Sequence, residues 1–126
     1  MVTFVDGLWA GEEEGPLKPS AKVAGVLMAG VDSVFVDLVA ATLMGFDYRK
    51  IKLLTGALTV RDYQLASGSV DCVALASNDP VWASLGGVAR HHLAFKPPRG
   101  WVGHIELGPS VPPGEASAAV ASRNVA

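Results

Sequence analysis

The carboxylates of Asp6, Glu14 and Asp37 are the groups in this sequence best suited to binding a divalent cation. Asp6 follows a short β-branched and aromatic run, and α/β sheets commonly bind ligands beyond the ends of their strands. Glu14 closes an acidic cluster in a glycine-rich stretch, and carboxylate oxygens are ligands that Mg²⁺ and Ca²⁺ prefer. One hypothesis is therefore a metal site formed by these three residues. The other interpretation is a solvated acidic turn, because the spacing matches no EF-hand and no phosphate-binding loop.

Asp37 is the one charged residue within an apolar stretch, residues 34–44, that is predicted to be a helix. No neighbour at helical spacing can pair with its charge. If the helix is packed on all sides, an unpaired carboxylate there is costly, so Asp37 must meet a distant cation, backbone donors, a metal or a wet cleft. The alternative is a purely structural buried hydrogen bond or ion pair.

Asp32 precedes the same predicted helix, where a helix N-terminus can bind an anion. Its residue type and place also suit a helix N-cap, which is the simpler role.

His104 and Glu106 share one face of a predicted last strand, residues 101–107. Their spacing allows a hydrogen bond or two ligands of one metal, and the alternative is an ordinary exposed strand face. The adjacent pair His91 and His92 fits no clear period. With no Ser-His-Asp order to argue and no nucleophile elbow, whether the chain is an enzyme stays open.

Composition predicts one domain over residues 1–108 followed by a disordered tail over residues 109–126, which are rich in Pro, Ala, Ser and Gly. The chain has 126 residues, of which 50% are hydrophobic and 17% are charged. That charged fraction is low for an independent soluble domain. We therefore expect some apolar surface to meet a partner, such as a second copy in a homo-oligomer.

Charge and cysteine content exclude several classes of function. A net charge of −2 without a basic run argues against nucleic acid. The single cysteine, Cys72, allows no internal disulfide and no iron–sulfur cluster held by this chain alone, and it suits the cytoplasm. The longest apolar run, residues 23–29, is far shorter than the ~20 residues of a membrane-spanning helix, and the start lacks the pattern of a secretion signal.

The patterning along the chain predicts an α/β fold with a mixed or mostly parallel small sheet and packed helices. Asp47 is expected to cap a second helix, and Gly86-Gly87 to break any helix near it. The expected elements are a strand at 2–5, a long loop at 7–22, a central strand covered on both faces at 23–28, helices at 34–44, 48–54 and 59–66, a buried strand at 70–76 and the last strand at 101–107.

An ordered set of short motifs is also present: Asp6-Gly7, Gly15-Pro16, Gly25 to Gly30, Asp32 to Asp37, Leu43 to Asp47 and the segment 100–106. With these motifs the chain resembles the carboxyl-terminal part of a prokaryotic family catalogued as domain of unknown function number 362. Members are usually much longer, and some are joined to ferredoxin-like cysteine clusters, which this chain lacks. The resemblance implies the distal half of a larger domain, so that a missing N-terminal half is the other expected partner. It places Asp6, Glu14, Asp32 and Asp37 at motif positions of no assigned role.

Two hypotheses follow. The first is a ligand-binding or scaffold half of a larger protein or oligomer, motivated by the low charge and the partial resemblance. The second is a divalent-metal-dependent enzyme domain whose carboxylates converge at the strand ends. The enzyme requires Asp6, Glu14 and Asp37 to approach one another in a cleft, whereas a scaffold lets them scatter.

Overall fold

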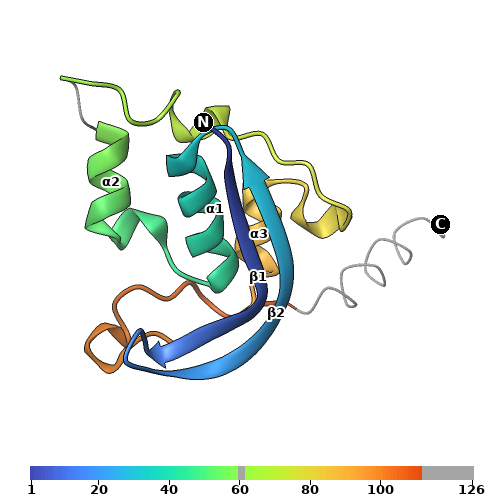
Figure 1. The fold of residues 1–126 in the computed structure, drawn as a ribbon, viewed down its shortest axis with the longest axis vertical. Coiled ribbons are helices and arrows are strands. Elements are labelled where there is room, and N and C mark those ends of the chain that lie inside the picture. The colour runs from blue at the N-terminus through green and yellow to red at the C-terminus, as the bar shows by residue number, and fades with distance from the viewer. Residues whose placement is uncertain (60–61, 112–126) are drawn as a thin grey trace, which may run out of the picture.

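The chain lays a long β-hairpin over a group of helices, as seen in the computed structural model, which describes residues 1–59 and 62–111 (Figure 1). In chain order the elements are β1 (Thr3–Glu14), β2 (Lys18–Gly30), α1 (Ser33–Met44), the 3-10 helix η1 (Tyr48–Lys50), α2 (Lys52–Thr59), η2 (Val70–Cys72), η3 (Pro80–Trp82), α3 (Leu85–Arg90) and η4 (Arg99–Trp101).

β1 and β2 pair antiparallel in a two-stranded sheet, so the predicted mixed or mostly parallel sheet is wrong. Glu14 lies opposite Lys18, and only residues 15–17 connect the strands. A connection this short permits antiparallel pairing alone, because parallel strands need a long crossover. The error came from treating residues 7–22 as a loop.

Residues 7–22 form strands because main-chain hydrogen bonds hold the two strands of a hairpin together, and these bonds require no alternation of apolar side chains. Gly11 permits close approach of the two strands, since a Cβ added there would lie 2.8 Å from the Cβ of Pro19. The strand predicted at 23–28 is confirmed within β2, but only one of its faces is covered. Val23 and Leu27 remain 65% and 70% exposed.

α1 begins and ends where its flanking residues predict. Asp32 is the N-cap and accepts hydrogen bonds from the backbone N–H groups of Val34 and Phe35. Gly45 ends the helix in the left-handed conformation with φ 95°, which a glycine adopts without the Cβ clash of other residues. Leu38, at the middle of α1, is fully buried.

The second predicted helix is divided into two shorter ones. Asp47 caps η1 by accepting from the backbone N–H of Arg49, as expected, but Ile51 is extended and α2 starts after it. The helix predicted at 59–66 is wrong for its described part: Thr59 is the last residue of α2, and residues 62–66 are not helical. Residues 60–61 lie outside the described ranges.

The buried strand predicted at 70–76 is also wrong. Residues 70–72 form η2, the next residue, Val73, has extended backbone angles, and residues 73–77 belong to no helix or sheet. The apolar run there was taken as a sign of strand pairing, yet a strand is completed only when a neighbour accepts its backbone hydrogen bonds. α3 then forms in spite of Gly86-Gly87, with Ser84 as its N-cap.

Residues 101–107 are turns and not the predicted last strand, apart from a single bridge between Phe46 and Glu106. Alternation suggested a strand, but Ile105 alone of the alternating set is buried, in a cluster with Phe46 and Phe95. Of the predicted tail, residues 109–111 are described and held by hydrogen bonds such as that from Val111 N–H to the Arg90 carbonyl, 2.8 Å. Residues 112–126 lie outside the described ranges.

A search of the described residues finds no helix with both the length and the apolar character needed to span a membrane.

Candidate functional site

The three carboxylates proposed as metal ligands do not meet. Asp6 and Glu14 are both on β1, eight positions apart, which corresponds to about 27 Å along an extended strand. Asp6 accepts a hydrogen bond from the backbone N–H of Leu8 at 3.1 Å, and Asp37 lies on α1. Over residues 1–59 and 62–111, no three His, Cys, Asp or Glu side chains gather in a way that could hold a metal ion.

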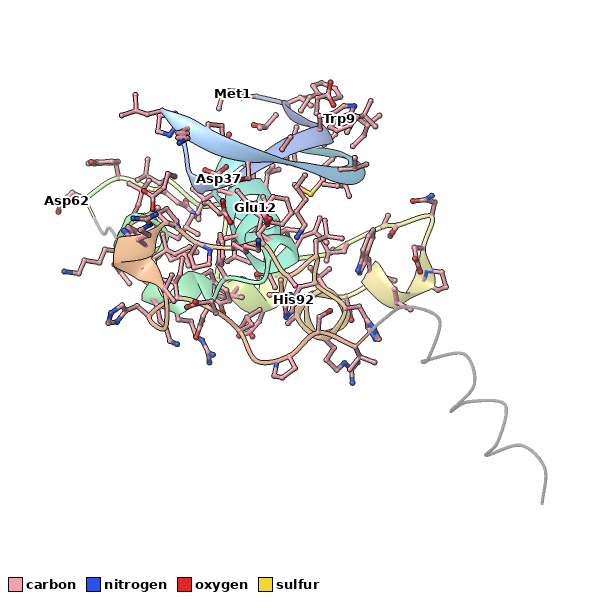
Figure 2. The ribbon with its side chains drawn as sticks, turned by 90° about the horizontal axis from the view of Figure 1, so that it is seen from below. Met1, Trp9, Glu12, Asp37, Asp62 and His92 are labelled. Atoms are coloured by element: carbon pink, nitrogen blue, oxygen red, sulfur yellow. The ribbon has the colours of Figure 1, made fainter. Side chains whose placement is uncertain are left out.

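Asp37 is exposed, so the condition under which its charge would need a partner, a helix packed on all sides, is not met. α1 buries only part of its circumference, and its wet side carries this carboxylate (Figure 2). Water therefore solvates the charge, and no distant cation is needed to compensate burial.

The acidic cluster of residues 12–14 fastens the hairpin tip to the segment that follows α3. Glu12 is bound by the ammonium group of Lys22 at 3.2 Å and by the backbone N–H of Lys96 at 3.0 Å. Glu13 accepts from Lys96 Nζ at 3.2 Å, and its own N–H donates to the Lys96 carbonyl. The Lys22 ammonium also lies 4.8 Å from the ring centre of Phe95. The cluster is thus an internal clasp, and neither a metal site nor a free acidic turn.

Electrostatics agree with this role. Burial by itself would raise the pKa of Glu12, but hydrogen bonds from Lys96 and Lys22 and their positive charges leave it below the usual value. The hydrogen bond from Ser20, followed by that from Lys96, lowers the pKa of Glu13. Glu14 accepts from the backbone N–H of Arg99 at 3.0 Å.

Asp32 joins α1 to a distant turn. One carboxylate oxygen caps the helix, and the other accepts a hydrogen bond from the backbone N–H of Ser67. Desolvation alone would raise the pKa of Asp32, but the hydrogen bonds from Ser67, Phe35 and Val34 outweigh it and lower the pKa. The capping role predicted from sequence is therefore present, and the carboxylate has donors on both oxygens.

Replacing Asp32 by alanine is expected to lower the free energy of unfolding at pH 7 by about 0.5–2 kcal/mol, the usual cost of a lost N-cap. Because folding lowers the pKa of Asp32, its contribution is complete above the unfolded-state pKa and is lost as pH falls through the folded-state pKa. Urea denaturation of both proteins from pH 7 to pH 2 should show the difference shrinking below about pH 4. A constant difference across that range would contradict the assignment.

His104 and Glu106 do not form a shared site. The Glu106 carboxylate accepts from the backbone N–H groups of Gly103 at 2.8 Å and Ile105 at 3.2 Å, so it stabilises its own turn. Backbone hydrogen bonds lower the pKa of Glu106, and the one from the Gly103 N–H contributes most. His104 is exposed on that turn.

His91 and His92 are buried, which the sequence pattern did not reveal. His92 Nδ1 accepts from the backbone N–H of Ala94 at 3.0 Å, so Nε2 carries the hydrogen that is donated to the Gly108 carbonyl at 2.9 Å. His91 Nδ1 lies 2.7 Å from the Val111 carbonyl oxygen. The two imidazoles therefore hold the start of the predicted tail, His92 at Gly108 just before it and His91 at Val111 within it.

A groove of about 530 Å³, a size typical of ligand sites, lies beside β2. Residues 25–30 of β2 form one wall and residues 73–78 form the other. The floor is apolar and includes Val36, Val39 and Leu43 of α1 and Val88 of α3. We refer to this feature as the β2 groove. In the sequence, the groove corresponds to two apolar runs without polar alternation. Such runs predict strands that are covered by other elements, but they do not identify those elements.

A second exposed feature is the outer face of the hairpin, on the side away from the helices. Figure 2 shows Trp9 on that side. Phe4 and Trp9 of β1 are 79% and 73% exposed, and Val23 and Leu27 of β2 are 65% and 70% exposed. We call these four residues the outer hairpin patch.

Comparison of the chain with protein-family models, with curated proteins and with solved structures finds no match.

Proposed function

We propose that this chain is the scaffold half of an oligomer, and that it associates with a second copy of itself through the outer hairpin patch. The observation that carries the proposal is the exposure of four large apolar side chains on one face of a two-stranded sheet. An apolar face of this kind marks an interaction site more often than a free surface. A two-stranded hairpin also gains stability when its second face is covered.

A second copy fits because the patch is self-complementary. In a two-fold interface each surface meets its own equivalent, so an apolar stripe meets an apolar stripe. Asp6 is the charged residue nearest the centre of this face, while Glu12 and Glu13 at the tip are engaged with Lys22 and Lys96. Two hairpins can therefore stack face to face, as sheets do at about 10 Å, with little like-charge contact.

The composition and the motif resemblance support the same proposal. A charged fraction of 17% leaves apolar surface to be covered, and the resemblance is to the distal part of a larger domain. The proposal includes a cytoplasmic location, which suits the exposed lone thiol of Cys72.

Sedimentation equilibrium across a concentration series tests the association. We expect the wild type to dimerise and Val23→Lys to move the equilibrium strongly toward the monomer, because an ammonium group would be buried in the interface. Val102→Lys is the matched control: Val102 is 58% exposed on the turn after η4. It should behave like the wild type. A wild type that stays monomeric at the highest concentration, or two variants that behave alike, would refute the proposal.

A further inference from the structure

The β2 groove is bounded by strand β2 and by a second stretch of main chain that belongs to no helix or sheet. Six consecutive residues of β2, 25–30, line it together with six consecutive residues of the segment 73–78. No residue of β1 lines it, so the groove lies along the edge of β2 that faces away from β1. Along that edge, alternate residues of a strand direct their N–H and C=O groups outward, where no β1 partner reaches them.

The opposite wall has the same property. Ala74, Leu75 and Ala76 make no hydrogen bond, through main chain or side chain, to any residue in the described part of the protein. The segment belongs to no helix or sheet, and its first residue, Val73, has extended backbone angles. Backbone N–H and C=O groups are strong hydrogen-bonding groups that require partners, and the free edge of β2 and this unpaired segment both border the same groove.

The floor and the charges of the groove restrict what can enter. Val36 and Val39 of α1 and Val88 of α3 offer apolar contact. Asp32 is the charged residue among the lining side chains, and its carboxylate already accepts hydrogen bonds on both oxygens. A charged ligand would find no partner on this floor, whereas apolar side chains at every second position of a strand would point onto it.

We propose that the β2 groove binds an extended, largely apolar segment of a different polypeptide, which enters as a strand between β2 and residues 73–78. This inference deepens the proposed function, because it rests on the chain being a binding scaffold and names its ligand class. Main-chain hydrogen bonds to both walls would supply affinity, and alternate side chains on the floor would supply selectivity, as in other cases of strand addition. A strand between the two walls needs two free edges. The hairpin of a second copy cannot fill the groove, since each of its strands already has one edge paired with the other strand.

The test uses the full chain and a blocked peptide, Lys-Val-Thr-Val-Ser-Val-Lys, with binding followed by fluorescence polarisation and by amide hydrogen exchange. We expect saturable binding together with new exchange protection at Ala74, Leu75 and Ala76. The same peptide with alternate backbone amides N-methylated keeps its side chains but loses one hydrogen-bonding edge. It should bind at least about 10-fold more weakly, since each lost main-chain hydrogen bond costs roughly 2- to 10-fold.

A pair of variants locates the binding. Leu75 lines the groove and is partly exposed, so Leu75→Glu should fold and should abolish the binding by placing a charge in the apolar site. Leu53→Glu is the matched control, because Leu53 is 80% exposed on α2 and does not line the groove. It should leave the affinity unchanged.

Several outcomes would overturn the inference. Equal binding of the two peptides would mean that the groove recognises apolar groups and not a strand. No protection of residues 74–76 at peptide concentrations up to about 1 mM would exclude even weak strand addition. Protection without peptide, appearing only as the chain associates, would mean that a second copy occupies the groove.

Val23→Lys separates this inference from the proposed function, because Val23 does not line the groove. Peptide binding by a chain that never dimerises would refute the association alone. Dimerisation of a wild type that binds no peptide would refute the strand-binding groove alone.

Discussion

Replacing Leu38 by alanine is expected to lower the free energy of unfolding by about 2–5 kcal/mol, the range observed when large buried side chains are truncated. Leu38 has no exposed surface and lies in the middle of α1. This helix lies beneath the hairpin and forms part of the floor of the β2 groove. Truncation removes buried methyl groups and leaves a cavity that the surrounding side chains fill only in part. Guanidinium denaturation followed by circular dichroism measures the change.

The control is Leu53→Ala, which removes the same atoms from a side chain that is 80% exposed. It should change the free energy of unfolding by no more than about 0.5 kcal/mol. If the two variants lost similar stability, Leu38 would not be the centre of the packed core, and the position of α1 under the hairpin would be in doubt.

Gly45→Ala is expected to destabilise the protein by about 2–5 kcal/mol, through two separate effects. Gly45 has φ 95°, a left-handed conformation that costs a residue with a Cβ roughly 1–2 kcal/mol. The added Cβ would also lie 2.5 Å from His92 Nδ1, and overpacking typically costs a further ~1–3 kcal/mol. The His92 ring cannot move away freely, because both of its nitrogens are hydrogen bonded.

Gly56→Ala is the matched control for this substitution. Gly56 lies within α2, and a Cβ added there would meet nothing within 4 Å. Alanine is the better helix former, so this variant should be as stable as the wild type or more stable by up to about 1 kcal/mol. Thermal and denaturant unfolding of the two variants give the comparison. A Gly45→Ala protein as stable as Gly56→Ala would show that the α1 C-cap and His92 do not meet as described.

The two glycines also show why the candidate site was only partly predictable. The place of Gly45 after an apolar helix predicts its C-cap, because that rule depends on neighbours in sequence. Its contact with His92, 47 positions later in the chain, has no such local signature. The same holds for Glu14, an expected metal ligand whose carboxylate instead accepts a hydrogen bond from the backbone N–H of Arg99.

The β2 groove depends on both local sequence and tertiary structure. The apolar run in residues 23–29 correctly predicted a strand, whereas the run within residues 70–76 was wrongly predicted to be a buried strand. They could not show that these two stretches would line one groove and leave their backbone edges unpaired, since hydrophobic pattern specifies a face of a strand but not its partner.

Local sequence by itself determined the strand within β2, the limits of α1 and its caps, the capping role of Asp47 and the low charge of the surface. Each of these follows from residue preferences acting over a few positions. Tertiary structure alone decided that the sheet is an antiparallel hairpin, that Asp37 stays in water, and that residues 73–78 lie across a groove from β2. Those features depend on which backbone and side-chain groups, distant in sequence, form hydrogen bonds and contacts with one another. In a folded chain the packing of the whole molecule decides which groups these are.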